Sequence, residues 1–478
     1  MSRLAMGIDL GTTAAKAVVL DGAGAVVASG AAPTRLLTGP GGLVEQEVAE
    51  VWAGAVRAAR QAVGGVSTRR DIRALALSSQ GGTLILLDGN GTPIGNAISW
   101  MDTRPAALGT ALLGGRDDAF FYDKTGWSLR LGCLPLAQLI RLRIVGGASL
   151  PRVRFVDSYV VERLTGEAAT NPSDAAIATL YNVRERRWDP GLLELAGVAA
   201  EALPRVVPSG TPLGPIRREA AEELGLSPDA IVVAGGHDQY CAAFGAGCRA
   251  AGDAVVSCGT AWVLLTMTTE ARFDQKARLA PAEAVTPGLW GLLGSCSSVG
   301  AAVDWFRRAA SAGPELSFEA LEAAAAAVKP SSDAPLFLPP GSGGGGAFVG
   351  LALHHTFGHL ARAVLEGPAL SVRALLDRMR AAGCAPATLR AVGGATRSRP
   401  WMQILSDAVG LPLEVAGTQD VAAYGAARLA GEATGIIPHD APRPAPAAHV
   451  EPDPGVREAY DTLYERFRRR RRGRRRER

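Results

Sequence analysis

Two segments of this chain, about 250 residues apart, share one pattern: an apolar run, a turn that contains Gly-Thr, and a second apolar run. The runs are Leu4–Leu10 and Ala14–Leu20 in the first segment, and Ala254–Cys258 and Trp262–Thr266 in the second. Short apolar runs on either side of a tight turn are typical of a β-hairpin. Two halves that each open with such a hairpin predict a duplicated α/β architecture with a central cleft between the halves.

The rest of the chain alternates between helical and extended patterns. A strand at Ala25–Ala28 should follow the first hairpin, and apolar residues at i, i+3 and i+4 spacing predict an amphipathic helix over residues 48–63. A Pro-rich segment, 437–455, reads as an extended linker before a last amphipathic helix at about 456–471. We also expect strands at Ile72–Ser78, Thr83–Leu87 and Leu389–Val392, and helices at Ala301–Ala310, Phe318–Val328, Thr356–Glu366, Ser371–Ala382 and from Trp401 onward.

Length and composition set the number of domains and the class of protein. The chain has 478 residues, of which 47% are hydrophobic, so it can form two or three domains and is too apolar to be wholly disordered. We expect an amino-terminal domain at 1–248, a carboxy-terminal domain at 249–436, and a linker, helix and Arg-rich tail at 437–478. No run approaches the about 18 apolar residues that a membrane-spanning helix needs, and the start lacks the pattern of a secretion signal, so we expect neither a transmembrane nor a secreted protein. The six cysteines form no C-x-x-C pair, so we expect no disulfide framework or zinc cluster, and a cytoplasmic location fits best.

Positive charge is concentrated at the carboxy terminus. The formal net charge is +4, but residues 466–478 contain ten Arg and one Glu, which leaves 40 basic and 45 acidic residues in the remainder. Such a run is more often a solvated end than a nucleic-acid anchor, and it lacks interleaved aromatic residues apart from Phe467. We therefore expect neither a membrane nor a nucleic acid as partner. A homodimer is compatible with the sequence, which does not determine the oligomeric state.

The turn of the first hairpin carries residues that can hold a phosphate. Gly11 lets backbone N–H groups approach an anion closely. The hydroxyls of Thr12 and Thr13 add donors, and Lys16 adds positive charge. Asp9, at the end of a buried strand, needs a cation or a hydrogen-bond donor to offset its burial. The alternative is an ordinary hairpin turn that Asp9 caps.

A second carboxylate, Asp238, follows the apolar run Ile231–Ala234 and two glycines. A carboxylate just beyond a buried strand, with glycines that give access to it, is well placed to act as a general base. The alternative is that Asp238 caps the helix predicted at Gln239–Phe244.

Two glycine turns in the second half are candidates for nucleotide binding. Gly259-Thr260 forms the turn of the second hairpin, where backbone N–H groups can again meet phosphate. Gly393-Gly394-Ala395 lies between a strand and a helix, an arrangement that lets a nucleotide lie against the backbone. The alternatives are an ordinary hairpin turn and an ordinary strand-to-helix turn.

Several other patterns do not predict a site. Gly341–Gly346 matches G-x-G-x-x-G only because five of its six residues are Gly, and we expect a flexible loop there. The chain has no GxxxxGK[ST] motif, so it is not a P-loop enzyme. His355 and His359 have a spacing that zinc can use, but no acidic residue lies between them, so we expect no metal there. Gly294–Gly300 lacks the GxSxG spacing of an esterase.

Taken in order, several motifs resemble the FGGY family of carbohydrate kinases, with xylulokinase-like members most similar, over about residues 4–470. The motifs are GIDLGTTAAK (7–16), GLVEQ (42–46), SQGG (79–82), WMDTR (100–104), FVDSYVVERLTGE with RRWDP (155–190), GGHDQYCAAFGAG (235–247), AFVGLALHHTFGHLARAVLEG (347–367) and GGATRSRPWMQILSD (393–407). The family implies two ribonuclease-H-like domains of the actin and hexokinase ATPase type that close on a central cleft. It also implies ATP-dependent phosphorylation of a sugar or polyol hydroxyl.

The resemblance implies roles for individual residues. Asp238 is expected to be the general base that deprotonates the acceptor hydroxyl, and Asp9 to hold Mg²⁺ through water. The expected contacts to ATP are Gly11, Thr12, Thr13 and Lys16 on one side of the phosphates, Gly259 and Thr260 on the other, and Gly393, Gly394 and Ala395 around the adenosine. The candidates for the sugar side, besides Asp238, are Gln80, Trp100, Asp102 and Arg104.

Three departures from the family pattern affect the expected site. Gly81-Gly82 stands where a xylulokinase usually has Met-His, which removes side chains expected against the substrate. The family's G-E-R-x-P segment is missing after Pro339-Pro340, and Ala395 replaces the third glycine of the adenosine motif. None of these changes affects Asp9 or Asp238.

The leading hypothesis is a kinase that phosphorylates a ketopentose such as xylulose, or a related ketose or polyol. The alternative is a non-catalytic sugar- or nucleotide-binding sensor that kept the kinase fold. The altered sugar loop and the missing segment motivate this alternative, and the presence of both carboxylates argues against it.

Overall fold

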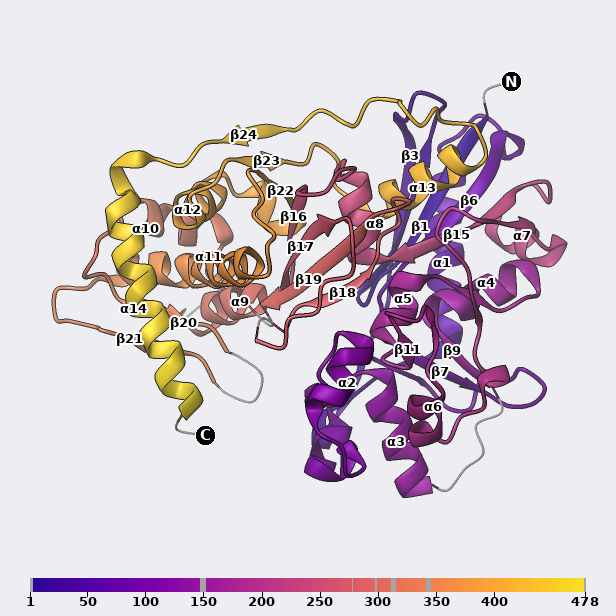
Figure 1. Cartoon of the computed structure of the whole chain (residues 1–478). Helices are drawn as coiled ribbons and strands as arrows, with labels where there is room; N and C mark the ends of the chain where they lie inside the picture. The colour runs from indigo at the N-terminus through magenta and orange to yellow at the C-terminus, as the bar shows by residue number, and fades with distance from the viewer. Residues whose placement is uncertain are drawn as a thin grey trace. The chain divides into compact units, whose positions relative to one another are not determined.

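The chain forms two compact units, each assembled from segments that are far apart in the sequence. The computed structural model describes residues 3–146, 152–276, 278–296, 299–310, 315–340 and 345–476 (Figure 1). Unit 1 comprises Met1–Ala251, Met267–Leu292 and Asp420–Pro444, and unit 2 comprises Gly252–Thr266, Leu293–Gln419 and Ala445–Arg478. The domain boundaries at 248 and 436 and the cleft between the halves stay predictions.

The main sheet of unit 1 has the strand order β14-β15-β6-β1-β2-β3. The first three strands form the predicted antiparallel meander, and β6 lies parallel to both β1 and β15. The carboxyl ends of β1, β6 and β15 therefore meet at one edge of the sheet. The bounds are β1 Leu4–Leu10, β2 Ala14–Leu20, β3 Val26–Pro33, β6 Ile72–Ser79, β14 Pro212–Pro215 and β15 Ile231–His237.

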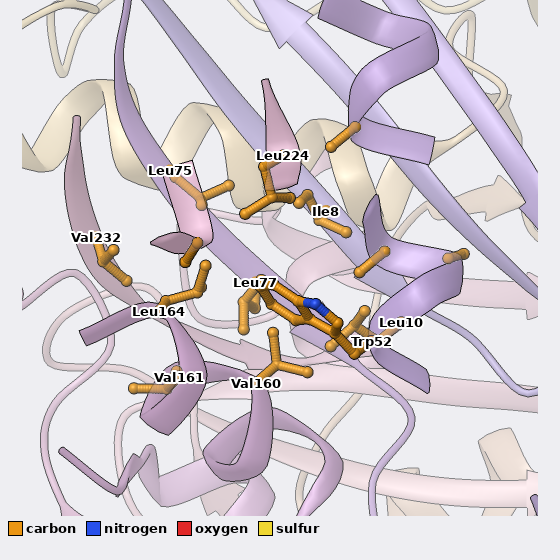
Figure 2. Close-up of a cluster of buried hydrophobic side chains, with 14 of the residues drawn as sticks. Ile8, Leu10, Trp52, Leu75, Leu77, Val160, Val161, Leu164, Leu224 and Val232 are labelled. Atoms are coloured by element: carbon orange, nitrogen blue, oxygen red, sulfur yellow. The ribbon is translucent and has the colours of Figure 1, made fainter. Parts of the chain in front are cut away.

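Helices cover both faces of this sheet because its strands are apolar on both sides. On one face, Trp52 of α1 packs among side chains from β1, β6 and the helices α4 and α7 (Figure 2). On the other face, α13 lies so close to β1 that a Cβ atom at Gly7 would come within 2.1 Å of the Ala423 carbonyl oxygen. Figure 1 shows α13, near the yellow end of the colour scale, beside the indigo strands. The bounds are α1 Val48–Val63, α4 Val156–Thr165, α7 Arg218–Leu224, α8 Asp238–Gly245 and α13 Val421–Ala433.

A second sheet in unit 1, ordered β4-β5-β8-β7-β9, has its own hydrophobic core, to which α3 contributes. The strand predicted at Thr83–Leu87 is β7, which begins at Leu84. This sheet positions the segment around residue 100, which directly follows β8. The bounds are β4 Leu37–Gly39, β5 Leu43–Gln46, β7 Leu84–Leu87, β8 Ala97–Ile98, β9 Arg152–Phe155, α2 Asp118–Thr125, α3 Pro135–Gly146, α5 Pro172–Ile177 and α6 Pro190–Ala196.

The large sheet with the second hairpin has the order β18-β19-β17-β16-β22-β23-β24. β16 and β17 are antiparallel, and β22 lies parallel to both β16 and β23. In each unit, two parallel strands thus stand beside the first strand of a hairpin, which confirms the predicted duplication. The bounds are β16 Ala254–Cys258, β17 Trp262–Thr268, β18 Ala280–Glu283, β19 Trp290–Cys296, β22 Leu389–Val392, β23 Leu413–Val415 and β24 Ala448–Val450.

One helix of unit 2 corrects a prediction. The helices expected at Thr356–Glu366 and Ser371–Ala382 are one continuous helix, α11, with Pro368 inside it. A proline removes a helical hydrogen bond and normally ends the helix. Here the residues on both sides of Pro368 are buried, and Ser371 donates its hydroxyl to the Gly367 carbonyl at 2.8 Å, so tertiary packing holds the helix together. The bounds are α9 Val299–Ala309, α10 Phe318–Ala326, α11 Phe357–Ala381 and α12 Arg399–Val409.

The carboxy-terminal helix, α14, runs from Arg457 to Arg476 and so continues past the predicted end at 471. Tyr460, Leu463 and Phe467 on one side of it are buried. The glycine loop expected at 341–346 lies largely outside the described residues. Within the part of the chain that the structure describes, no helix is both long and apolar enough to cross a membrane.

Candidate active site

Asp9 and Asp238 lie at the same edge of the main sheet of unit 1. Asp9 stands near the end of β1, and Asp238 directly follows β15, with β6 between the two strands. On β6, Ser78 pairs with Asp9 on one side and with Gly236 on the other. The Ser78 hydroxyl donates a hydrogen bond to Asp9 Oδ1 at 2.7 Å. The alternative that Asp238 caps the next helix does not hold, because α8 begins at Asp238 and His237 is its N-cap.

The surroundings of these two carboxylates favour their protonated forms. Exclusion of water and the negative charge of Asp238 raise the pKa of Asp9 to about 7, although Ser78 and Lys16 oppose the rise. Exclusion of water also raises the pKa of Asp238 to about 6. A carboxylate whose pKa lies close to neutrality can both accept and release a proton under working conditions, which is the property that a general base needs.

Lys16 forms an ion pair with Asp420 at 2.8 Å. Asp420 is the N-cap residue of α13 and belongs to unit 1 although it lies more than 400 residues from Lys16. Sequence reasoning missed Asp420, because nothing in its own neighbourhood indicates which strand its helix covers.

Three residues from separate segments, Thr12, Gln46 and Gln80, form a hydrogen-bonded ring at the first turn, and Trp100 is attached to it through Thr12. The Thr12 hydroxyl donates to Gln80 Oε1 at 2.8 Å and accepts from the Trp100 indole nitrogen at 3.1 Å. Gln46 accepts from the Gln80 amide at 2.8 Å and donates to the Thr12 carbonyl at 3.0 Å. The structure thus joins a residue predicted for phosphate, Thr12, to two predicted for the sugar. Gln46 was part of a family motif but was given no role. Thr13 is exposed at the same turn.

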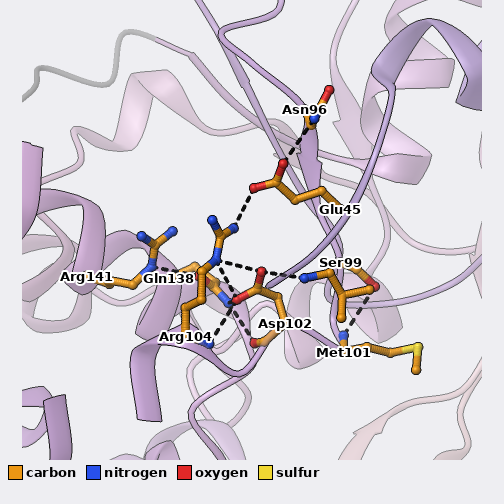
Figure 3. A network of polar contacts seen from close by, with 9 residues as sticks. Glu45, Asn96, Ser99, Met101, Asp102, Arg104, Gln138 and Arg141 are labelled. Carbon is orange, nitrogen blue, oxygen red and sulfur yellow. Dashed lines mark hydrogen bonds and ion pairs between the residues drawn. The ribbon is translucent and has the colours of Figure 1, made fainter. Parts of the chain in front are cut away.

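Asp102 and Arg104 belong to a network with Glu45 and Gln138 (Figure 3). The Asp102 side chain is fully enclosed, and its oxygens accept hydrogen bonds from the Val44 backbone, Arg104 and Gln138. Burial by itself raises the pKa of Asp102, but these donors outweigh it and hold the pKa below its usual range. Arg104 also pairs with Glu45 at 2.6 Å and is 22% exposed. Arg104, and not Asp102, is therefore the member of this pair that solvent reaches.

The nucleotide candidates of unit 2 lie at the ends of neighbouring parallel strands. Gly259-Thr260 is the turn after β16, and Gly393 directly follows β22, which pairs with β16 up to Ser257 and Val392. Gly393 has a φ of +97°, and a Cβ atom there would lie 2.9 Å from the Cys258 carbonyl oxygen.

Two further segments meet these turns. The backbone N–H groups of Gly300 and Ala301, at the start of α9, donate to the Thr260 carbonyl at 3.0 and 3.1 Å. The Thr396 hydroxyl donates to the Gly393 carbonyl at 2.7 Å. Gly259, Thr260 and Gly394 remain exposed, and Ala395 is half-buried. Sequence reasoning did not include α9, because its approach to the hairpin depends on tertiary packing.

Comparisons with known proteins identify the family. The model of the N-terminal domain of the FGGY family of carbohydrate kinases matches residues 4–245, and the model of the C-terminal domain matches residues 254–434. The chain belongs to the FGGY family of carbohydrate kinases. This membership confirms the resemblance drawn from the motifs and, with it, the two-domain α/β fold of the actin and hexokinase type.

Relatives with curated names include kinases for two different acceptors. The chain is 32% identical over 466 residues to a glycerol kinase of Polaromonas naphthalenivorans (strain CJ2), with 90% of each chain covered. It is 31% identical over 440 residues to a xylulose kinase of Klebsiella pneumoniae, with 89% of each chain covered. The crystal structure of xylulose kinase from Rhodospirillum rubrum superposes with a TM-score of 0.87 at 28% identity, with 97% of each chain covered.

The FGGY membership establishes the class of reaction. The chain is a phosphotransferase with an alcohol group as acceptor, ATP as phosphoryl donor and a sugar or polyol as the acceptor molecule. The comparisons do not distinguish xylulose from glycerol, so the acceptor is part of the proposal below.

Proposed function

We propose that this FGGY kinase transfers the γ-phosphoryl group of ATP to a hydroxyl of a ketopentose such as xylulose, or of a related ketose or polyol, with Asp238 as general base. The observation that carries the proposal is the pair of carboxylates, Asp9 and Asp238, at the ends of strands on either side of β6. A phosphoryl-transfer site needs two acidic groups: one that holds the metal ion and one that receives the proton of the acceptor hydroxyl.

Asp238 would accept the proton of the attacking hydroxyl as the oxygen approaches the γ-phosphorus. Its pKa of about 6 leaves it mostly ionised at neutral pH, yet basic enough to take a proton. Positioning and charge neutralisation supply most of the rate in such reactions, so the orientation of this carboxylate matters as much as its basicity.

Asp9 fits the role of a magnesium residue. Mg²⁺ in kinases usually keeps several waters and binds through one or two carboxylates and the phosphates, so a closed cage of ligands is not needed. The described residues contain no group of three or more His, Cys, Asp or Glu that could hold a metal ion. Asp9 Oδ1 accepts from Ser78, and Gly11 adds no side chain beside Oδ2. When bound, the ion would neutralise charge on the phosphates.

For the phosphates we propose contacts from Gly11, Thr12, Thr13 and Lys16, and from Gly259 and Thr260. The hydroxyl of Thr12 is already hydrogen-bonded to Gln80 and Trp100, so Thr12 would contact the phosphates through its backbone. Thr13 offers an exposed side chain. Gly393, Gly394 and Ala395 would line the adenosine pocket. The close approach of Gly393 to Cys258 supports this, because it places the two glycine turns side by side.

On the sugar side, we propose that Gln80, Trp100 and Arg104 contact the acceptor. Asp102 would act through Arg104, because its carboxylate is fully enclosed and fully hydrogen-bonded. An indole, an amide and a guanidinium are side chains that suit a small molecule with several hydroxyl groups.

The experiment combines a panel of acceptors with one variant. Purified protein, ATP and Mg²⁺ are mixed with xylulose, other ketoses, glycerol and other polyols, and ADP release is measured. Asp238→Asn should lower kcat by about 10²–10⁴-fold with the best acceptor and leave ATP binding unchanged. Asp440→Asn, at an exposed position, is the control and should retain full activity.

Two results would contradict the proposal. Undiminished turnover in Asp238→Asn would remove Asp238 as the base. ADP release that no acceptor stimulates would instead favour the non-catalytic sensor.

A further inference from the structure

In unit 1, a side chain at position 81 would overlap the ring of His237. A Cβ atom at Gly81 would lie 2.4 Å from Cδ2 and 2.8 Å from Nε2 of the His237 ring. Gly81 has no positive φ that would require glycine. The volume where a side chain at position 81 would stand is therefore occupied by the imidazole of His237 and by Cγ2 of Ile177, which lies 2.6 Å from the same Cβ position.

The His237 ring is held in place from several directions. His237 pairs with Ser79 on β6, and the backbone N–H of His237 donates to the Ser173 hydroxyl at 3.0 Å. The ring lies 5.9 Å, centroid to centroid, from that of Tyr240. The side chain is only 7% exposed. Exclusion of water lowers the pKa of His237 to about 4, so the ring is neutral at pH 7 and carries one N–H.

One oxygen of the base faces this ring. His237 Nε2 lies 3.2 Å from Asp238 Oδ1, and both Oδ1 and the Nδ1 atom of the ring are buried without any hydrogen-bond partner. A buried carboxylate oxygen needs a donor, and hydrogen bonds at catalytic groups often align only when substrate binds. The tautomer with the proton on Nε2 places an N–H within reach of this oxygen, where it can align when substrate binds, whereas the other tautomer would set a lone pair against the oxygen. Electrostatics therefore select the Nε2–H form.

The other titratable groups around Asp238 cannot replace this donor. Those that act on it electrostatically include Asp9 on β1, Asp174 on α5 and Cys241 on α8, and none of them carries positive charge. Gln239, the next residue in the sequence, hydrogen-bonds the same carboxylate but leaves Oδ1 unpartnered.

We infer that His237 is a positioning residue for the proposed base: its Nε2–H holds Asp238 Oδ1, so that the second carboxylate oxygen is presented to the acceptor hydroxyl, and the absence of a side chain at Gly81 leaves room for the imidazole. This inference rests on the proposed function. It assigns a role to His237, the residue before the proposed base. It also relates Gly81, one of the two glycines that stand where a xylulokinase usually has Met-His, to the position of the imidazole.

A matched pair of substitutions tests the donor. Gln can place an amide N–H near the position of Nε2, whereas Asn reaches only the position of Nδ1. His237→Asn should lower kcat by about tenfold to a hundredfold, and His237→Gln should stay within about threefold of wild type. The KM values for ATP and for the acceptor should change less than about twofold in both. If the role of His237 were purely structural, the kcat values of the variants would instead fall in step with their midpoint temperatures of thermal unfolding. His237→Gln would then retain no more activity than His237→Asn.

Gly81→Ala tests the same contact without changing the histidine. Its methyl group would lie 2.4 Å from the ring and 2.6 Å from Ile177 Cγ2, so we expect the ring to shift and kcat to fall about as far as in His237→Asn; adding Gly81→Ala to His237→Asn should lower kcat little further. Gly89→Ala, where a Cβ atom would meet nothing within 4 Å, is the control and should leave kcat unchanged. Full activity in Gly81→Ala, or strictly additive losses in the double variant, would overturn the inference.

Two further measurements separate this inference from the proposed function. Asp238→Asn is assayed in parallel: if it is inactive while His237→Asn is fully active, only the positioning role fails. If Asp238→Asn is active, the proposed base fails. Nitrogen-15 NMR of labelled histidine needs no substrate and should show the neutral Nε2–H tautomer for His237. A neutral Nδ1–H tautomer would overturn the inference.

Discussion

Asp9 should lower the stability of the unliganded protein above neutral pH, so replacing it with Asn should stabilise the fold. Burial and the nearby Asp238 raise the pKa of Asp9 from 3.8 to about 7. The folded state therefore binds the proton more tightly than the unfolded state, and the free energy of unfolding falls as the pH rises from about 4 to about 7. Asn has nearly the same shape, carries no charge and can still accept the hydrogen bond from Ser78.

The size of the effect follows from the pKa. Each pKa unit corresponds to about 1.4 kcal/mol, so a rise from 3.8 to about 7 gives an upper limit of about 4 kcal/mol at pH 8. Asp9 is half-buried, and solvent screening reduces this value, so we expect a gain of about 2–4 kcal/mol for Asp9→Asn. At pH 5 Asp9 is protonated in the folded state, and the difference should fall to less than about half of its value at pH 8.

Urea unfolding in the presence of EDTA, at pH 8 and pH 5, measures this difference between Asp9→Asn and wild type. Asp440→Asn, which removes an exposed carboxylate, should change the unfolding free energy at neither pH. The stabilised Asp9→Asn protein should also lose phosphoryl transfer, which separates loss of function from loss of fold. An Asp9→Asn variant no more stable than wild type at pH 8, or one whose advantage is the same at pH 5, would refute the reasoning.

Two further predictions concern pH and the sugar side. Because the pKa of Asp238 is raised to about 6, kcat/KM should fall with decreasing pH below about 6, and a profile flat down to pH 4.5 would contradict its role as the base. Asp102→Asn should lower the free energy of unfolding by about 2–4 kcal/mol, because it leaves Arg104 with Glu45 as its remaining carboxylate and weakens the hydrogen bonds around a fully buried side chain. Equilibrium unfolding of the Asp102→Asn variant tests this second prediction. An unfolding free energy equal to that of wild type would contradict it.

Much of the fold follows from local patterns in the sequence. The apolar runs around the two Gly-Thr turns predict both hairpins, and the i, i+3, i+4 pattern predicts α1 at residues 48–63. The break predicted inside α11 was wrong, because a proline rule describes the isolated backbone and not the burial around Pro368. The assignment of α13 to unit 1 was also beyond local reasoning, since the residues that attach it to β1 lie at the opposite end of the chain.

The amino-acid order alone determined which carboxylates stand at strand ends, because an acidic residue near the end of an apolar run and beside a glycine turn is a local and one-dimensional signal. It did not determine what surrounds them. Only the folded chain brought Ser78 between Asp9 and Gly236, joined Thr12 to Gln46, and placed the His237 ring over Gly81. Hydrogen bonds and steric contacts act over a few ångströms in space, and residues separated by tens to hundreds of positions come within that range only when the sheet and its helices have packed.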